Sequence, residues 1–300
     1  MYIDNKMRII WKTGSTGMTK RTKVISIILI SVCTTGLTFA FPPIPQDPGY
    51  HNFADTRGLA GIPNFGDVMS NLFFMLFGLM GMAAVFMSRY ENTVFTMKGE
   101  IIPWGMFFVG AFMVGIGSGY YHLEPNNQTL VWDRLPMTIA FMSFFSLAVM
   151  ERFSEKAGLL LLPAFLVVGA GSVFYWDYTE TLGNGDLRAY ALVQFLPMLL
   201  LPLMFWILPA RYSGMKYLGY VLFWYLLAKI LEYYDAIIFD LTGELVSGHT
   251  LKHVAAALAV YMMVVYVTKR RPRHEYADHV VSPRQKNNIK ISQEMRQESP

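Results

Sequence analysis

The chain has 300 residues, of which 54% are hydrophobic and only 15% are charged. Soluble domains carry about 25% charged residues, so this composition excludes an ordinary soluble protein and indicates an integral membrane protein. Its 20 methionines and 22 phenylalanines favour helices in lipid over a β-barrel, whose strands would alternate polar and apolar residues. The single cysteine excludes a disulfide within the chain and a thiolate metal site. The net charge of +4 does not indicate a nucleic-acid partner, because the basic residues gather at loop ends and in the C-terminal tail.

Apolar runs long enough to span a membrane, about 17 to 25 residues each, occur along most of the chain. They fall at 24–41, 67–88, 101–121, 134–150, 158–176, 190–208, 217–239 and 249–268. The first follows a basic stretch and ends in small residues, so residues 1–41 predict a basic N-terminus with either a signal peptide or an extra retained helix. The remaining runs predict an all-α bundle of seven transmembrane helices over residues 67–268, preceded by an external segment at 42–66.

The charges of the connections predict the orientation of the bundle. Alternate connections are basic, and these carry Arg89, Lys98, Arg152, Lys156, Arg211, Lys216 and the run 269–273. The intervening connections, 122–133, 177–189 and 240–248, are mainly acidic. By the positive-inside rule the basic connections are cytoplasmic and the acidic ones external. Residues 269–300 then form a basic cytoplasmic tail, predicted to be disordered because it lacks apolar periodicity.

Three histidines and one aspartate lie at the outer edge of three predicted helices. They are His122, Asp133, His249 and His253. Ser118 and His122 are four residues apart, as are His249 and His253, so each pair projects from one helix face. Neutral imidazole is the commonest metal-binding side chain, and three nitrogens with a water form the usual open shell of catalytic zinc. These residues predict a zinc site, with iron as the alternative metal.

The same constellation predicts roles for two further side chains. In zinc proteases a glutamate between the two helical histidines serves as the base, but here that position is Thr250. Asp133 is therefore the expected proton acceptor for a metal-bound water. Ser118, one turn before His122, is expected to donate a hydrogen bond to the water or to the developing oxyanion.

Two other polar clusters allow two interpretations each. Lys229, Glu232 and Asp235 follow one another along the sixth predicted core helix and form either a buried ion pair or the lining of a polar cavity. Asp55, Asn64 and Asp67 precede the first core helix and offer oxygen ligands to a hard cation such as Ca²⁺. The same residue types also make ordinary turns and helix caps.

At these positions the chain resembles the alkaline ceramidase family, seven-helix membrane hydrolases related to adiponectin-receptor-like and hemolysin-III-like proteins. The resemblance covers roughly residues 50–268. It rests on Gly117-Ser118-Gly-Tyr-Tyr-His122, Asp133-Arg134-Leu-Pro136-Met and Ser247-Gly-His249-Thr-Leu-Lys-His253. The segment Ile62-Pro-Asn64-Phe-Gly-Asp67-Val-Met-Ser70-Asn71 is similar to the family's entry into its first helix. Pro136 suits the first turn of the helix that it begins.

The resemblance implies a zinc bound by His122, His249 and His253, with Asp133 and Ser118 beside the metal-bound water. It also implies hydrolysis of the amide in ceramide or another N-acyl lipid, releasing a fatty acid and a long-chain amine. Some members carry calcium before the first helix, but the fewer carboxylates here weaken that expectation. The extra N-terminal segment looks bacterial, which implies an inner-membrane protein whose metal site faces the periplasm. The alternatives are a receptor with a structural zinc and an ion- or proton-coupled transporter.

Overall fold

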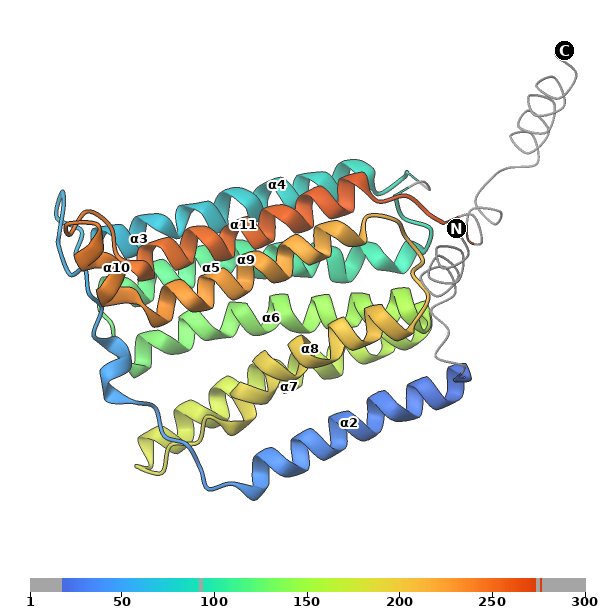
Figure 1. Cartoon of the computed structure of the whole chain (residues 1–300), viewed down its shortest axis with the longest axis horizontal. Coiled ribbons are helices and arrows are strands. Elements are labelled where there is room, and N and C mark those ends of the chain that lie inside the picture. The colour runs from blue at the N-terminus through green and yellow to red at the C-terminus, as the bar shows by residue number, and fades with distance from the viewer. Residues whose placement is uncertain (1–17, 92–93, 274–275, 277–300) are drawn as a thin grey trace, which may run out of the picture.

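The regular elements of this computed structural model, which describes residues 18–91, 94–273 and 276, are helices. They are α2 (Lys20–Ala40), η1 (Pro48–His51), α3 (Phe65–Ser70), α4 (Leu72–Ser88), η2 (Lys98–Glu100), α5 (Ile101–Leu123), α6 (Asn127–Arg152), α7 (Glu155–Thr181), α8 (Arg188–Ile207), α9 (Met215–Tyr233), α10 (Asp235–Leu241) and α11 (Gly248–Lys269). The long helices run side by side in one bundle (Figure 1).

Seven helical segments of the described chain are long and apolar enough to cross a membrane, and the N-terminal α2 is one of them. This confirms the predicted all-α membrane fold. The expected span 217–239 differs, because it is divided at Tyr234 into α9 and the short α10. α9 is not among the seven segments, since its 19 residues include Lys216, Lys229 and Glu232. It still lies in the bundle, packed along α11 (Figure 1).

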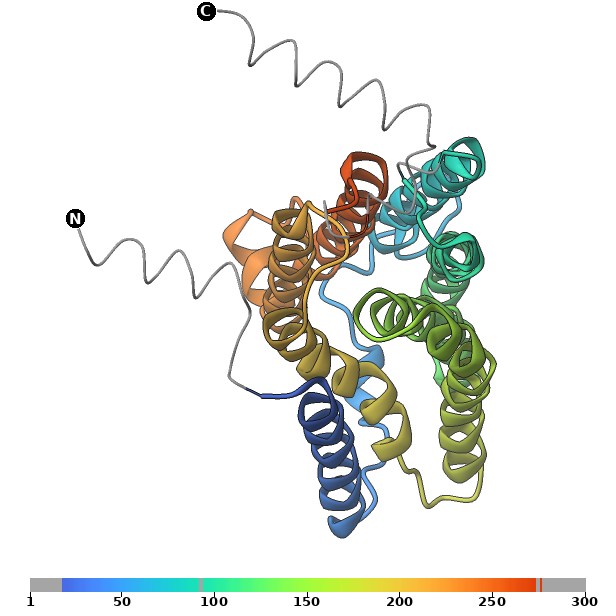
Figure 2. The ribbon, with the colours of Figure 1, turned by 90° about the vertical axis from the view of Figure 1, so that its right-hand side faces the viewer.

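Six helices surround a central cavity of about 380 Å³. Around the cavity α9 packs on α11, α11 on α4, α4 on α5, α5 on α6 and α6 on α8 (Figure 2). α8 and α9 complete the ring at the cavity, where the Gln194 amide donates to the Tyr225 hydroxyl at 3.1 Å. α7 packs outside the ring on α6 and α8, and α2 packs on α8. The interior of the ring is therefore a cavity that is partly open to the outside.

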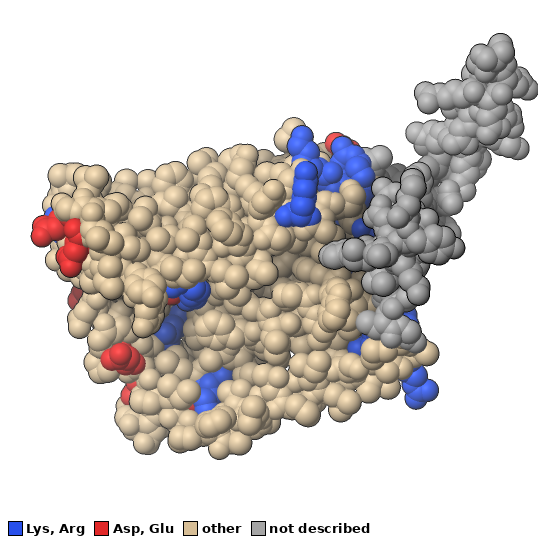
Figure 3. Space-filling view, in the orientation of Figure 1, with Lys and Arg blue, Asp and Glu red and all other residues tan. Residues whose placement is uncertain are grey.

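The outer surface of the bundle is apolar. Large hydrophobic side chains stand exposed on helices all around it, including Leu29, Leu79, Val167, Trp206 and Phe223. Figure 3 shows acidic side chains at the end where α3 and α10 lie and a group of basic side chains at the opposite end, with further basic side chains in a hollow between them and at the lower edge. Contiguous apolar surface of this extent between two charged ends is what a bilayer requires of its proteins.

A close approach of α5 and α6 depends on one glycine and one proline. Pro136 lies well inside α6 rather than in its first turn as predicted, because α6 begins at Asn127 with an Asn126–Thr129 capping box. A proline cannot donate the helical hydrogen bond to the carbonyl four residues before it, here that of Trp132. A Cβ on Gly117 would stand 2.0 Å from that carbonyl oxygen. Only glycine therefore lets the two helices meet here, one residue from Ser118.

The first core helix is divided into α3 and α4. Ser70 and Asn71 both turn their side chains back onto the carbonyl of Asp67, at 3.0 and 2.8 Å. Such side-chain bonds compete with the helical ladder and mark its interruption. α3 is thereby a separate short element that contacts both α5 and α11.

α2 lies on the outside of the bundle. Ile27 packs in a cluster with Leu200 and Leu201 of α8, and Lys23 Nζ donates to the Ile207 carbonyl at 2.7 Å. The other predicted fate of this segment, removal as a signal peptide, stays a prediction.

A buried charge network closes the end of the bundle opposite α3 and α10. Arg270 is fully buried, where it pairs with Glu100 and Glu151 and stacks its guanidinium 4.0 Å from the Tyr212 ring. Residues 269–273 are thus ordered parts of the bundle, which corrects the predicted start of the tail. The buried pairing partners explain the difference, since both carboxylates lie far away in the sequence. Most of the remaining predicted tail lies outside the described residues.

Removing the Arg270 charge should destabilise the protein strongly. Arg270→Met would leave two buried carboxylates without a cation, a change that typically costs about 3–5 kcal/mol. We expect a clear fall in the thermal unfolding temperature of the detergent-purified protein. Arg271→Met, at an exposed neighbouring arginine, is the matched control and should stay within about 0.5 kcal/mol of the wild type. Equal stability of the two variants would contradict a stabilising role for the network.

Candidate metal centre and its cavity

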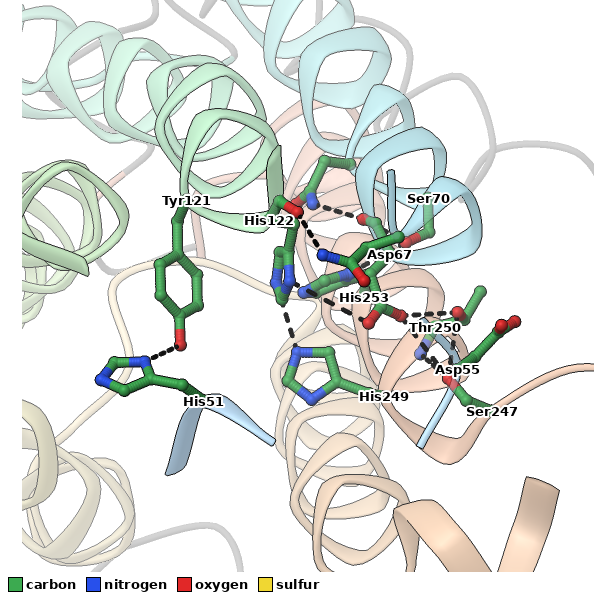
Figure 4. A network of polar contacts seen from close by, with 12 residues as sticks. His51, Asp55, Asp67, Ser70, Tyr121, His122, Ser247, His249, Thr250 and His253 are labelled. Atoms are coloured by element: carbon green, nitrogen blue, oxygen red, sulfur yellow. Dashed lines mark hydrogen bonds and ion pairs between the residues drawn. The ribbon is translucent and has the colours of Figure 1, made fainter. Parts of the chain in front are cut away.

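Three buried histidines converge at the end of the bundle where α3 and α10 lie. His122 comes from the last turn of α5, and His249 and His253 come from the first turns of α11. Each of the three rings lies 4.9 Å from the other two, centroid to centroid. One ligand nitrogen from each lies within 4.8 Å of the others, which makes the group a potential metal site (Figure 4).

Side chains of α3 and its preceding loop hold this cluster. Ser70 Oγ lies 2.8 Å from His253 Nδ1, and the Asn64 amide donates to the His122 carbonyl at 2.8 Å. Asp67 is fully buried; its Oδ1 accepts from Thr250 Oγ1 at 2.7 Å, and its Oδ2 lies 4.0 Å from His122 Nδ1. Partners of this kind orient metal-binding imidazoles and select the nitrogen that faces the ion.

The arrangement fits a metal ion. His122 Nε2 and His249 Nε2 face each other at 3.3 Å, so two ring nitrogens aim at one small space. The contact of Ser70 with His253 Nδ1 leaves Nε2 of that ring as the nitrogen for a ligand. His122 Nδ1 and Asp67 Oδ2 are buried, and neither has a hydrogen-bond partner within the described part of the chain. Three imidazoles with a carboxylate behind one of them form a donor set of the kind that binds zinc.

The start of α11 is fixed against the break between α9 and α10. Ser247 caps α11 by accepting from the Thr250 amide at 3.0 Å, and the Asp235 carboxylate accepts from the His249 amide at 2.7 Å. A Cβ on Gly248 would stand 2.4 Å from the Leu231 carbonyl oxygen. The glycine therefore allows the first turn of α11 to approach α9 closely enough to bring His249 to His122.

The external segment covers the cluster. The Phe53 ring lies 4.6 Å from the His122 ring and 4.3 Å from that of His249. Its neighbour Ala54 donates its amide to Asp235 at 3.0 Å, which ties the segment to α10. His51 bonds the Tyr121 hydroxyl at 2.8 Å and lies to one side of the three clustered histidines (Figure 4). An aromatic cover of this kind limits access of water to the imidazoles.

Ser118 and Asp133 lie on the cavity side of the cluster. Both line the central cavity together with His253, and their side chains interact with each other. The structure therefore brings the two predicted reacting residues and one predicted ligand to a single space. Their roles in a reaction stay predictions.

The residues predicted to bind calcium have other partners. Asp55 forms a two-pronged ion pair with Arg57, at 2.7 Å for each bond. The Arg57 hydrogen bonds lower the pKa of the Asp55 carboxyl, which is therefore ionised and committed to Arg57 at neutral pH. The Asn64 amide and Asp67 face His122, as described above. Calcium binding by these three residues stays a prediction, while the geometry gives Asn64 and Asp67 a place beside the histidines.

The charged residues on α9 were predicted to form either an ion pair or the lining of a polar cavity, and two of them do both. Glu232 bonds Lys229 at 2.7 Å and Lys252 of α11 at 2.8 Å, and all three line the cavity. Asp235 is not part of this group, because its carboxylate faces the amides of Ala54 and His249. The sequence contained no sign that Lys252 would join it. The roles of Ser70, Phe53 and Asp235 beside the histidines were also missed, since they depend on contacts between distant segments.

The model of a protein family described as Ceramidase matches residues 52–285 of the chain. The match includes the three histidines, Ser118 and Asp133, and it begins directly before Phe53. A comparison with curated proteins finds none that matches.

The support of His122 by Asp67 can be tested through metal affinity. Asp67→Asn keeps the shape but removes the negative charge behind the imidazole, and loss of such a partner weakens metal affinity by about 10–100-fold. Zinc affinity is measured by competition with a chelating dye. Asp240→Asn, which changes an exposed carboxylate at the same end of the bundle, is the matched control. An unchanged affinity in Asp67→Asn would show that the carboxylate does not serve the site.

Proposed function

Because the chain belongs to the ceramidase family, and is therefore a hydrolase acting on an amide bond, we propose that it cleaves a membrane N-acyl lipid at a zinc centre. The zinc ligands are His122, His249 and His253. The substrate is ceramide or another N-acyl lipid, and the products are a fatty acid and the amine that it acylated.

One observation carries this proposal: three imidazoles converge beside a cavity that also holds a hydroxyl and a carboxylate. A bound zinc lowers the pKa of a coordinated water and polarises a carbonyl oxygen. Structural zinc sites are closed by four protein ligands, whereas catalytic sites keep one position open. The cavity beside His253 supports a site at which a substrate amide is held.

The residues of the chain supply the remaining steps. Asp133 accepts the proton of the attacking water, whose oxygen bonds to the acyl carbon of the amide. The Ser118 hydroxyl donates a hydrogen bond to the oxyanion that develops on that carbon. Asp133 then returns the proton to the amine nitrogen as the carbon–nitrogen bond breaks. Phe53 covers the cluster, so that these charges develop away from bulk water.

The walls of the cavity suit a lipid chain. Phe107, Met137, Phe141, Phe144 and Val260 belong to its lining, which is largely apolar away from Ser118, Asp133 and the charged side chains on α6, α9 and α11. A fatty acyl chain that passes from the bilayer into this cavity exchanges one apolar environment for another, so its methylene groups stay out of water. The amide of such a lipid then lies at the polar end of the cavity, next to His253.

The charges at the two ends of the bundle support one orientation. The histidine end is acidic and the end with Arg270 is basic (Figure 3). By the positive-inside rule the basic end is cytoplasmic. In a bacterial inner membrane the metal centre would then face the periplasm, where it meets lipids of the outer leaflet.

Loss of one ligand should abolish both metal binding and hydrolysis. We expect wild-type protein to bind about one zinc per chain and to release fatty acid from ceramide, phytoceramide or an N-acyl amino acid lipid. His253→Ala should lose the metal and the activity together. Metal content is measured by mass spectrometry of the protein-bound elements, and fatty-acid release by mass spectrometry of the lipid extract.

His51→Ala is the matched control for metal content, because His51 lies outside the cluster of three histidines. It should retain zinc at the wild-type ratio. Zinc binding without release from any lipid would favour a receptor with a structural metal. A wild-type protein without zinc would contradict the proposed centre.

Asp133→Asn should separate proton transfer from metal binding. The amide cannot accept the proton of the attacking water, and general-base catalysis contributes about 10²–10⁴-fold to a rate. We expect kcat to fall by that amount while zinc content stays at the wild-type level. A variant with full activity would assign the proton transfer to another group.

A further inference from the structure

We propose that the headgroup of the substrate carries a negative charge close to the amide, and that Lys229, Lys252 and Arg134 bind it. This inference rests on the proposed function and specifies its substrate class. The lipid is then an N-acyl amino acid or another N-acyl lipid with a single acidic group beside the amide nitrogen, in preference to neutral ceramide.

The first observation is the charge of the cavity. Besides His253, its ionisable lining includes the cations Arg134, Lys229 and Lys252 and the carboxylates Asp133 and Glu232. Asp133 interacts with Ser118 and belongs to the proposed reacting groups. Glu232 alone is bonded to both lysines, at 2.7 and 2.8 Å. The lining thus holds three cations and two carboxylates, an excess of one positive charge before any metal ion is counted, and uncompensated charge in apolar surroundings is unfavourable.

The second observation is the environment of Arg134. Its side chain is only 5% exposed, and its Nη2 donates to the Gln46 side chain at 2.6 Å. Its Nη1 is buried without a hydrogen-bond partner, and Arg134 forms no ion pair within the described residues. The guanidinium stacks 4.1 Å from the Trp176 ring and 4.7 Å from that of Tyr190. Held in this way, it offers a carboxylate the planar donors for which arginine is suited.

The third observation is the position of these cations. Lys252 directly precedes His253 on α11, and Arg134 directly follows Asp133 on α6. Lys252 and Asp133 also interact electrostatically across the cavity. All three cations line the same cavity as Ser118, Asp133 and His253. A carboxylate two bonds from the amide nitrogen would therefore enter the space that the cations line, whereas the hydroxyls of a ceramide would leave the excess positive charge uncompensated.

Access to the cations is open from one side. The Lys229 side chain is 39% exposed and that of Lys252 is 18% exposed. Basic side chains lie in a hollow beside α9 on the face seen in Figure 3. Each ammonium has three donors, and Glu232 takes one from each. Donors therefore remain for a ligand that enters the cavity.

The test compares an acid with its neutral ester. The zinc-loaded protein is given N-palmitoylglycine, its methyl ester and ceramide, and palmitate release is followed for each. A charge-assisted hydrogen bond is worth about tenfold or more in affinity, so kcat/KM for the acid should exceed that for the ester by at least about tenfold. Lys229→Gln should lower this ratio, and Glu232→Gln should raise it. Lys216→Gln, an exposed lysine on the same helix outside the cavity, should leave it unchanged.

The outcomes separate the inference from the proposed function. Cleavage of ester and ceramide with no preference for the acid would overturn the inference and leave the function intact. If no lipid is cleaved, the proposed function fails, and calorimetric titration of the protein with the acid and the ester still tests the inference. Equal affinity for the two would overturn it.

The product palmitate also has a carboxylate, formed from the acyl side of the amide, and the cations could bind this group instead of the headgroup. If the cations serve the product, Lys229→Gln will weaken inhibition by palmitate relative to hexadecanol, while the ratio of acid to ester stays near one. That result would also overturn the inference.

Discussion

The buried carboxylate of Asp67 holds the histidine end of the bundle together. It belongs to α3, accepts a hydrogen bond from Thr250 of α11 and lies against His122 of α5. Thr250 satisfies Oδ1, while the buried Oδ2 has no hydrogen-bond partner within the described residues and faces His122; burial of a charge far from such neighbours would cost much more than in water. This cost limits how α3, α5 and α11 can be placed relative to one another. The meeting of the three imidazoles depends on that placement.

The opposite end of the bundle is closed by a network of the same physical kind. Arg270 pairs there with Glu100 and Glu151 and brings the chain after α11 back onto the starts and ends of other helices. The bundle is thus fixed by buried charges at both ends. Between them the ring around the cavity is completed by α8 and α9, which share the hydrogen bond of Gln194 with Tyr225. The cavity thus lies between two ends at which buried charged side chains join separate helices.

The cavity joins two chemical environments. At its polar end lie Ser118, Asp133 and His253, with Lys229 and Lys252 beside them, and the remaining walls are mostly aromatic and aliphatic. Electrostatic interactions are strong in such a space because little water screens them. In the proposals above, Ser118 and Asp133 serve the reaction at the amide, and Lys229, Lys252 and Arg134 serve the choice among headgroups. Because different side chains carry the two roles, experiments can separate them.

Composition and spacing alone predict the membrane class, the helical fold and the three histidines that converge in the candidate metal centre. Length and hydropathy predict spans because a lipid-embedded backbone must satisfy its hydrogen bonds within the helix. The four-residue spacing of His249 and His253 predicts a shared helix face for the same local reason. A position that depends on one segment, such as His122 at the end of its helix, accordingly lies close to its predicted place.

The tertiary structure decided everything that joins distant segments. Asp67 was expected among calcium ligands and lies behind a histidine, Arg270 was expected in a tail and is buried, and Lys252 joins Glu232 from another helix. Pro136 lies inside α6 because the capping box at Asn126 starts that helix earlier than hydropathy indicates. Hydropathy describes one segment at a time, whereas the partner of a buried charge depends on how the whole bundle packs. Local spacing does not reveal that packing or the cavity inside it.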